Sequence, residues 1–146
     1  MCRSLTLATI LLLATTLAEA ATPEDAIKYR QAVMSTLAGN VSAINLIFTG
    51  KVEHQDALLG HAEALATAAG RLGSLFPAGS GVGKTDALPL VWEEPERFQK
   101  AVDTARTATA ALRNAVRSGD RAATARALKP VFDSCKGCHD RYQKPE

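Results

Sequence analysis

The 146-residue sequence predicts an all-α fold, an antiparallel up-down four-helix bundle with a long loop between its second and third helices. Three observations lead to this prediction. Apolar residues recur at intervals of three and four, the spacing of an amphipathic helix. No segment alternates apolar and polar residues as a half-buried strand does. Glycine and proline divide the pattern into four helical segments, and one of the connections between them is conspicuously long.

Residues 1–20 have the features of a secretory signal peptide. Arg3 gives a basic start, Leu5–Leu17 is apolar or hydroxylated, and small residues surround a predicted cleavage point after Ala20. A membrane anchor is the alternative, but this apolar run is shorter than the roughly 20 residues that cross a bilayer. We therefore expect a mature domain of residues 21–146 that is exported to the periplasm and soluble, with no membrane partner.

The first predicted helix begins after Thr22 and ends near Gly50. Thr22 can cap the helix, Pro23 suits its first position, and two acidic residues follow at the positive end of the helix dipole. Its apolar residues are Ile27, Met34, Leu37, Val41, Ile44 and Phe48. Their spacings of three, four and seven place them in one stripe, which predicts an amphipathic helix that packs on its neighbours.

The second predicted helix runs from about Val52 to Phe76, where Pro77 ends it. The following segment, Pro77 to Glu94, is rich in glycine and contains Pro89. Two helices joined by a tight turn would not need so long a connection, so we expect a loop that covers part of the bundle.

The third predicted helix begins at Pro95 and reaches Ser118-Gly119, and Asp120 can cap the fourth. Pro130 falls inside this last helix. A proline there cannot donate a backbone hydrogen bond, so we expect a bend that frees the carbonyl near Arg126.

Charge and cysteine content limit the possible functions. The formal net charge is +2, and removing residues 1–20 takes out Arg3 and Glu19 together, so the balance does not change. A nearly neutral domain lacks the basic surface that nucleic-acid binding requires. Of the three cysteines, Cys2 lies in the signal segment, which leaves Cys135 and Cys138 in the mature domain.

These two cysteines belong to the sequence Cys135-Lys136-Gly137-Cys138-His139 near the end of the fourth helix. Cys-x-x-Cys-His is the attachment motif of c-type haem. Positions i, i+3 and i+4 share one helix face, so the three side chains project together. The motif predicts one covalently bound haem c, with thioethers from Cys135 and Cys138 and His139 as an axial ligand of the iron.

Three other interpretations of the cysteine pair are weaker. A disulfide between Cys135 and Cys138 would close a very short loop and stabilise the fold little. A thioredoxin-like redox pair normally accompanies strands, which this sequence lacks. A zinc site needs four ligands, and His54 and His61 are spaced too widely for the usual pair of histidine ligands.

The second axial position of the iron would determine the chemistry. Met34 is the one methionine of the mature domain, and it lies in the apolar stripe of the first helix. It can fill the core beside the haem or serve as a sixth ligand. Arg30 lies one turn earlier on the same face. A buried arginine needs a partner, and a haem propionate would supply one, although an exposed arginine at the rim is the alternative.

With Tyr29–Met34 and Ala87–Trp92, the haem motif close to the C-terminus resembles cytochrome c′ and the related class II cytochromes c. The resemblance covers the whole mature domain. It implies a periplasmic four-helix bundle, usually a homodimer, with the haem held between the helices. It also implies contacts with the haem from Arg30, Gln31, Met34 and Trp92.

The resemblance implies a five-coordinate, high-spin iron with His139 as its one protein ligand and Met34 over the open face. Such proteins bind nitric oxide (NO) and carbon monoxide (CO), exchange single electrons with redox partner proteins, and are not enzymes. The alternative is a low-spin electron-transfer cytochrome with His139 and Met34 as axial ligands. Gln143 departs from the family, because a basic residue often occupies that position.

Two further functions are less well supported by the sequence. A peroxidase needs a distal acid or base to cleave an O–O bond, and Arg30 alone is weak evidence for such a catalytic group. Haem as a purely structural element of a partner-binding bundle would leave the iron without a role.

Overall fold

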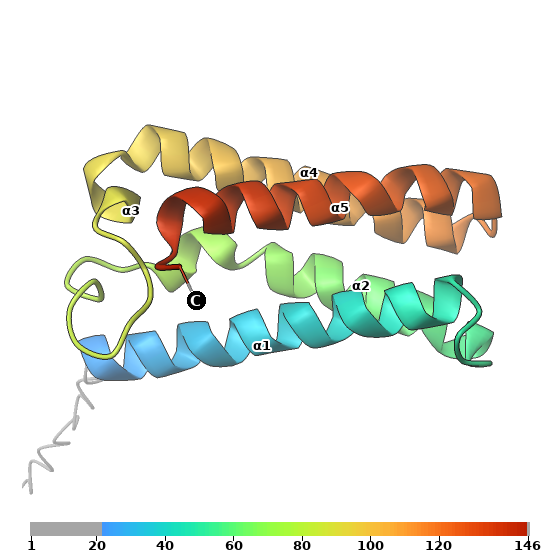
Figure 1. The fold of residues 1–146 in the computed structure, drawn as a ribbon, viewed down its shortest axis with the longest axis horizontal. Helices are drawn as coiled ribbons and strands as arrows, with labels where there is room; N and C mark the ends of the chain where they lie inside the picture. Colours follow the sequence, from blue (N-terminus) through green and yellow to red (C-terminus); the bar gives the residue numbers. More distant parts are fainter. Residues whose placement is uncertain (1–21, 146) are drawn as a thin grey trace, which may run out of the picture.

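The computed structural model describes residues 22–145, so the predicted signal peptide lies outside the described residues. In chain order the elements are α1 (Pro23–Phe48), the 3₁₀ turn η1 (Gln55–Ala57), α2 (Leu58–Ala69), the 3₁₀ turn η2 (Leu72–Leu75), α3 (Leu90–Glu93), α4 (Pro95–Arg117) and α5 (Arg121–Tyr142). The main helices run up and down, with α1 and α2 in one layer and α4 and α5 in the other (Figure 1). The predicted all-α four-helix bundle is confirmed.

Local signals fix the helix ends where the sequence predicts them. The hydroxyl of Thr22 and the carboxylate of Asp120 each accept a hydrogen bond from a backbone N–H three residues further on, at 3.1 and 3.0 Å. These bonds satisfy free donors in the first turns of α1 and α5. Gly50 and Gly119, with φ of 72° and 73°, follow α1 and α4 in the left-handed conformation that favours glycine.

The extent predicted for the second helix, Val52–Phe76, is wrong. The α-helical part is α2, with a 3₁₀ turn on either side. The helix ends at Gly70, where the backbone N–H of Arg71 bonds to the carbonyl of Ala68, in the tighter 3₁₀ pattern. Gly70 and Gly73 both disfavour an α-helix, and they outweigh the apolar pattern that continues beyond them.

The long connection before Pro95 is present, but it is not wholly irregular. Its last part forms α3, a single turn that begins after Pro89 and packs against α4 and α5. An isolated bridge pairs Ala87 with Gln143, just beyond the end of α5. The part of the chain that the structure describes contains no β-strand apart from this bridge.

Three of the four sides of the bundle are closely packed. The pairs α1–α2, α2–α4 and α4–α5 pack closely along their backbones, whereas within residues 22–145 the backbones of α1 and α5 lie further apart. Side chains join these two helices at the end away from the loop, where Arg121 of α5 donates a hydrogen bond to the Phe48 carbonyl of α1 at 2.9 Å. The largest core cluster, at the end away from the loop, contains Ile44, Ala62, Leu65, Ala108, Leu112, Leu128 and Val131. We call the side between α1 and α5 the open side, because this is where helix packing leaves space.

Candidate functional site

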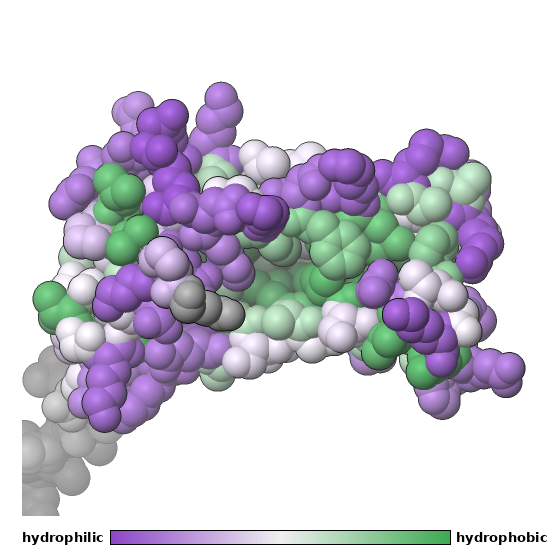
Figure 2. All heavy atoms as spheres, viewed as in Figure 1, coloured by the Kyte–Doolittle hydropathy of each residue, from purple (hydrophilic) through white to green (hydrophobic). Residues whose placement is uncertain are grey.

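A cavity of about 430 Å³ lies on the open side of the bundle. Figure 2 shows it as an apolar hollow between the positions that α1 and α5 occupy in Figure 1. Its walls include Met34, Leu37 and Val41 from α1, Phe98 and Val102 from α4, and Phe132, Cys135, Cys138 and His139 from α5. The space that α1 and α5 leave between them is therefore a mainly apolar cavity with two thiols and an imidazole in its wall.

A second cavity of about 260 Å³ adjoins the first, because Met34, Phe76, Phe98, Cys138 and His139 line both. It lies towards the loop end of the bundle and is more polar. Its further lining residues include Arg30, Gln31, Thr85, Asp86 and Gln143. The combined space has an apolar part along α5 and a polar part at the loop.

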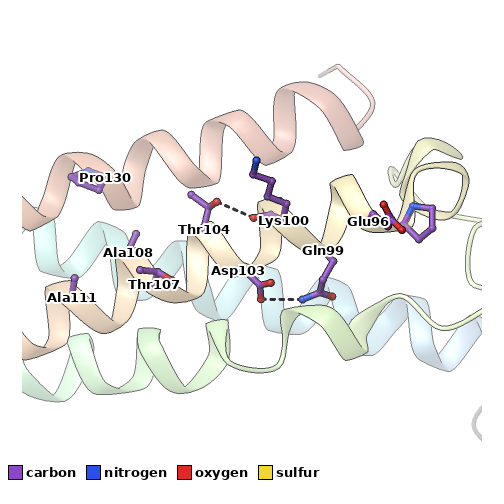
Figure 3. Close-up of a pocket in the computed structure, with 10 residues that line it drawn as sticks. Glu96, Gln99, Lys100, Asp103, Thr104, Thr107, Ala108, Ala111 and Pro130 are labelled. Atoms are coloured by element: carbon purple, nitrogen blue, oxygen red, sulfur yellow. Dashed lines mark hydrogen bonds between the residues drawn. The ribbon is translucent and has the colours of Figure 1, made fainter.

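A larger, open groove of about 950 Å³ runs along the outer face of α4 (Figure 3). Its lining residues carry charged or small side chains, among them Glu96, Lys100 and Asp103, with Pro130 from α5. Among the described residues, no cysteine, histidine or large apolar side chain lines this groove. The described residues of this groove therefore supply no thiol or imidazole that could hold a haem.

The haem-motif residues come together on the wall of the larger cavity. Cys135, Cys138 and His139 all line it, as their shared helix face requires. Both cysteines are free thiols and half buried. Burial raises the pKa of Cys135, and burial together with the neighbouring Cys135 raises the pKa of Cys138 to about 11. Two neutral thiols in an apolar wall suit the apolar edge of a porphyrin better than they suit a hydrated metal ion.

Met34 and Gln31 reach the cavities from α1, on the wall opposite α5. Met34 is half buried and lines both cavities, as His139 does. Gln31 lines the smaller cavity and donates a hydrogen bond to the carbonyl of Lys84 at 3.2 Å. The structure thus places the candidate sixth ligand and the predicted axial histidine around one continuous space.

Arg30 is buried, with 4% of its surface exposed, so the alternative of an exposed rim arginine is wrong. Its guanidinium donates to the Leu75 carbonyl at 3.2 Å and to the Ser80 hydroxyl and carbonyl at 3.0 and 2.9 Å. A fourth bond, at 2.7 Å, goes to the Thr85 hydroxyl. Burial lowers the pKa of Arg30. Arg30 lines the smaller cavity. The protein itself supplies the hydrogen-bond partners that a buried arginine needs, so a cofactor is not required for that purpose.

Trp92 does not line either cavity. Its ring lies against Gly81, where a Cβ atom would come within 2.7 Å of the indole. Its indole N–H points to the carbonyls of Phe76 and Pro77, at 3.2 and 3.3 Å. The structure therefore places this predicted haem contact within the loop, where it holds the backbone in position.

A second group of lining residues comes from the loop, and no pattern in the sequence points to them. We call residues 84–88 the loop strap. Its Leu88 N–H donates to the carbonyl of Tyr142 at 2.8 Å, and the backbone N–H of Lys144 donates to the carbonyl of Asp86 at 2.8 Å. The ammonium of Lys144 donates to the Thr85 carbonyl at 2.7 Å. The strap joins α1, through Arg30, to the chain just beyond the haem motif.

A bidentate ion pair also anchors the end of α5. Arg141, two residues after His139, donates from Nη2 to both carboxylate oxygens of Glu94, at 2.7 and 2.6 Å, and from Nε at 3.1 Å. Hydrogen bonding from Arg141 lowers the pKa of Glu94. The pair fixes the start of α4 against the helix that carries the haem motif.

We expect Glu94→Gln to lower stability at neutral pH, with an effect that disappears in acid. A depressed pKa in the folded state stabilises the protein above the ordinary value of 4.5, and this contribution is lost as the pH falls through the folded-state value. Thermal unfolding midpoints of both proteins between neutral and acidic pH would converge below that range. Glu63→Gln, which breaks the more exposed pair with Arg117, is the matched control. A constant difference across the whole range would contradict this assignment.

The residues present fit a covalently bound haem. The larger cavity supplies apolar walls for a macrocycle, with two thiols and an imidazole on one side. The smaller cavity supplies hydrogen-bonding groups, among them Gln31 and Gln143, for the carboxylates at one edge of a haem. Within residues 22–145 no three histidine, cysteine or acidic side chains cluster as ligands of a metal ion, so the structure does not favour the zinc interpretation.

Known proteins resemble the chain over most of its length. The family model described as Cytochrome C' matches residues 25–143. Cytochrome c′ of Rhodospirillum rubrum is 31% identical to this chain over 130 residues, and the match covers 88% of each chain. Cytochrome c′ of Pararhodospirillum photometricum is 30% identical over 125 residues, and the match covers 85% of this chain and all of the relative. A solved nitric oxide complex of a cytochrome c prime variant from Alcaligenes xylosoxidans superposes with a TM-score of 0.80 at 29% identity, covering 88% of this chain and all of the other.

Proposed function

The chain belongs to the cytochrome c′ family, whose members carry covalently attached haem c, and from this premise we propose that it is a periplasmic protein that binds nitric oxide and carbon monoxide and transfers single electrons. His139 would be the one protein ligand of the iron. The nitric oxide complex of the similar Alcaligenes protein supports the choice of ligand. We further propose that the protein forms homodimers and exchanges electrons with redox partner proteins.

One observation carries this proposal: the cavity on the open side has the haem motif on its α5 wall and mainly apolar residues elsewhere. Cys135 and Cys138 would hold the porphyrin through thioethers, and His139 would donate its imidazole to the iron. Haem iron supplies one-electron redox chemistry and an open coordination position for a diatomic ligand. Met34 would cover that position from α1 and exclude water from it.

The lining residues favour ligand binding over peroxide chemistry. Among the described residues that line the two cavities, His139 is the one histidine and Asp86 the one acid, and Asp86 lies at the loop. Arg30 is engaged by four hydrogen bonds to Leu75 of η2 and to Ser80 and Thr85 of the loop. O–O cleavage requires a distal acid or base, and these lining residues favour ligand binding over that chemistry.

A low-spin electron-transfer cytochrome is the second candidate, and the position of Met34 favours it. Met34 and His139 line the same two cavities, so a thioether is available on the wall opposite the imidazole. In this alternative Met34 would be the sixth ligand, and carbon monoxide would have to displace it.

Optical spectra of the ferric and ferrous protein, with and without carbon monoxide, separate the two candidates. We expect high-spin spectra and rapid stoichiometric binding of carbon monoxide, and we expect Met34→Leu to preserve both, because an apolar side chain of similar volume still covers the iron. A low-spin ferric spectrum with a methionine-to-iron charge-transfer band, lost in Met34→Ala, would contradict the proposal and establish the second candidate.

A further inference from the structure

The larger cavity extends well beyond the residues that would hold the iron. On α5 it reaches from His139 back to Phe132, seven positions or about two helical turns away. On α1 it reaches from Met34 to Asn45, which is eleven positions or about three turns. The apolar space therefore continues along the bundle axis, away from the loop.

This extension opens to solvent on the open side. Ala38 and Ser42 of α1 line the cavity and are exposed, and Phe132 lines it from α5 with 40% of its surface exposed. Because the backbones of α1 and α5 lie further apart than those of the other neighbouring helices, these three side chains form the rim of the space. The apolar hollow in Figure 2 lies on this side of the molecule.

At the opposite end the larger cavity meets the smaller one, whose lining is more polar. Thr85 and Asp86 of the loop strap line it, and Lys144 and the buried Arg30 hold the strap at Thr85. Asp86, Gln31 and the other polar groups there would have to lose hydrogen bonds or water for an apolar molecule to pass. A small apolar molecule partitions favourably into the other end, where Val41 and Phe132 supply mainly apolar walls.

From these observations, and on the basis of the proposed function, we propose that diatomic ligands reach the haem site through a mouth on the open side. Ala38 and Ser42 form one edge of this mouth and Phe132 the other. Phe132 sets its width, because it is the bulkiest of the three and the others are small. Phe132 is thus an access-controlling residue, seven positions before His139 on α5.

Two variants that change the mouth from opposite helices test the proposal in the haem-loaded protein. Phe132→Ala should raise the rate of carbon monoxide rebinding after flash photolysis by roughly tenfold, within the range that association rates span in a mutant series, and Ser42→Phe should lower it similarly. A change in the width of the mouth alters only the barrier that the ligand crosses on its way in or out. The dissociation rate should therefore change by the same factor as the association rate, and the Kd should stay constant. Tyr29→Ala, an exposed aromatic residue of α1 that lines neither cavity, should leave both rates unchanged.

A second readout does not depend on ligand binding by iron. In the zinc-substituted protein, quenching of the porphyrin triplet state by dissolved oxygen should be faster in Phe132→Ala and slower in Ser42→Phe. If the native protein binds no carbon monoxide, the proposed function fails, while the quenching rates still report the access route. Unchanged quenching in both mouth variants, or acceleration in Lys144→Ala instead, would overturn the route and place access at the loop strap.

Discussion

The double substitution Cys135→Ala, Cys138→Ala should abolish covalent haem attachment completely. Both thiols lie in the wall of the larger cavity, and no other cysteine occurs among the described residues that could replace them. The variant should lose the haem on acidic acetone extraction and show no haem stain after a denaturing gel. Without a bound haem, the apolar walls of the cavity would face solvent, so the protein should also unfold at a lower temperature.

The single variants and a neighbouring residue provide the controls. Cys138→Ala alone should leave one thioether, which shifts the band of the pyridine haemochrome but keeps the haem on the chain. Lys136→Ala changes an exposed side chain between the two cysteines that pairs with Asp140, and it should leave attachment intact. Haem that stays covalently bound in the double variant would contradict the assignment of the attachment site.

Arg30→Leu should lower the free energy of unfolding of the haem-loaded protein by about 3–5 kcal/mol. The guanidinium serves four buried acceptors, and leucine would leave the carbonyls of Leu75 and Ser80 and the hydroxyl of Thr85 short of donors. Denaturant unfolding followed by haem absorbance and by circular dichroism gives the change directly.

The matched control for this variant is Arg106→Leu. Arg106 is half exposed and pairs with Asp103 at 3.4 Å, an arrangement that contributes about 0–1 kcal/mol. A loss of less than about 1 kcal/mol in Arg30→Leu would mean that the loop is held by other contacts. Arg30→Lys should recover only part of the loss, because a lysine ammonium lacks the planar fork that serves two neighbouring acceptors.

Sequence reasoning predicts the parts of this fold that depend on neighbouring residues. Thr22, Gly50, Asp120 and Gly119 act within one or two turns, and the helix ends that they predict are present in the structure. The second helix was predicted too long because its apolar pattern runs through Gly70. A helical pattern in the sequence does not reveal where a tighter turn lets the chain change direction.

In the candidate site, too, the sequence predicts the residues that neighbouring positions determine and misses those that depend on the folded loop. Cys135, Cys138 and His139 share a helix face by spacing alone, and the structure brings them to one cavity. The partners of Arg30 lie 45 to 55 residues away, at Leu75 of η2 and at Ser80 and Thr85 of the loop, so no local pattern in the sequence identifies them. Trp92 was predicted at the haem because its motif resembles the family, whereas its place against Gly81 depends on how the loop folds back.

The open side of the bundle also bears on the order in which the chain folds. The pairs α1–α2 and α4–α5 are neighbours in the sequence, and contacts of this kind form early and fast. Helices α1 and α5 are the first and last helices of the domain, so bringing them together has the largest entropic cost of loop closure. Direct contacts between them are concentrated at the end away from the loop, as in the hydrogen bond from Arg121 to the Phe48 carbonyl. A haem bound between them would add contacts along the rest of their length, so its attachment would both load the cofactor and join the first helix to the last.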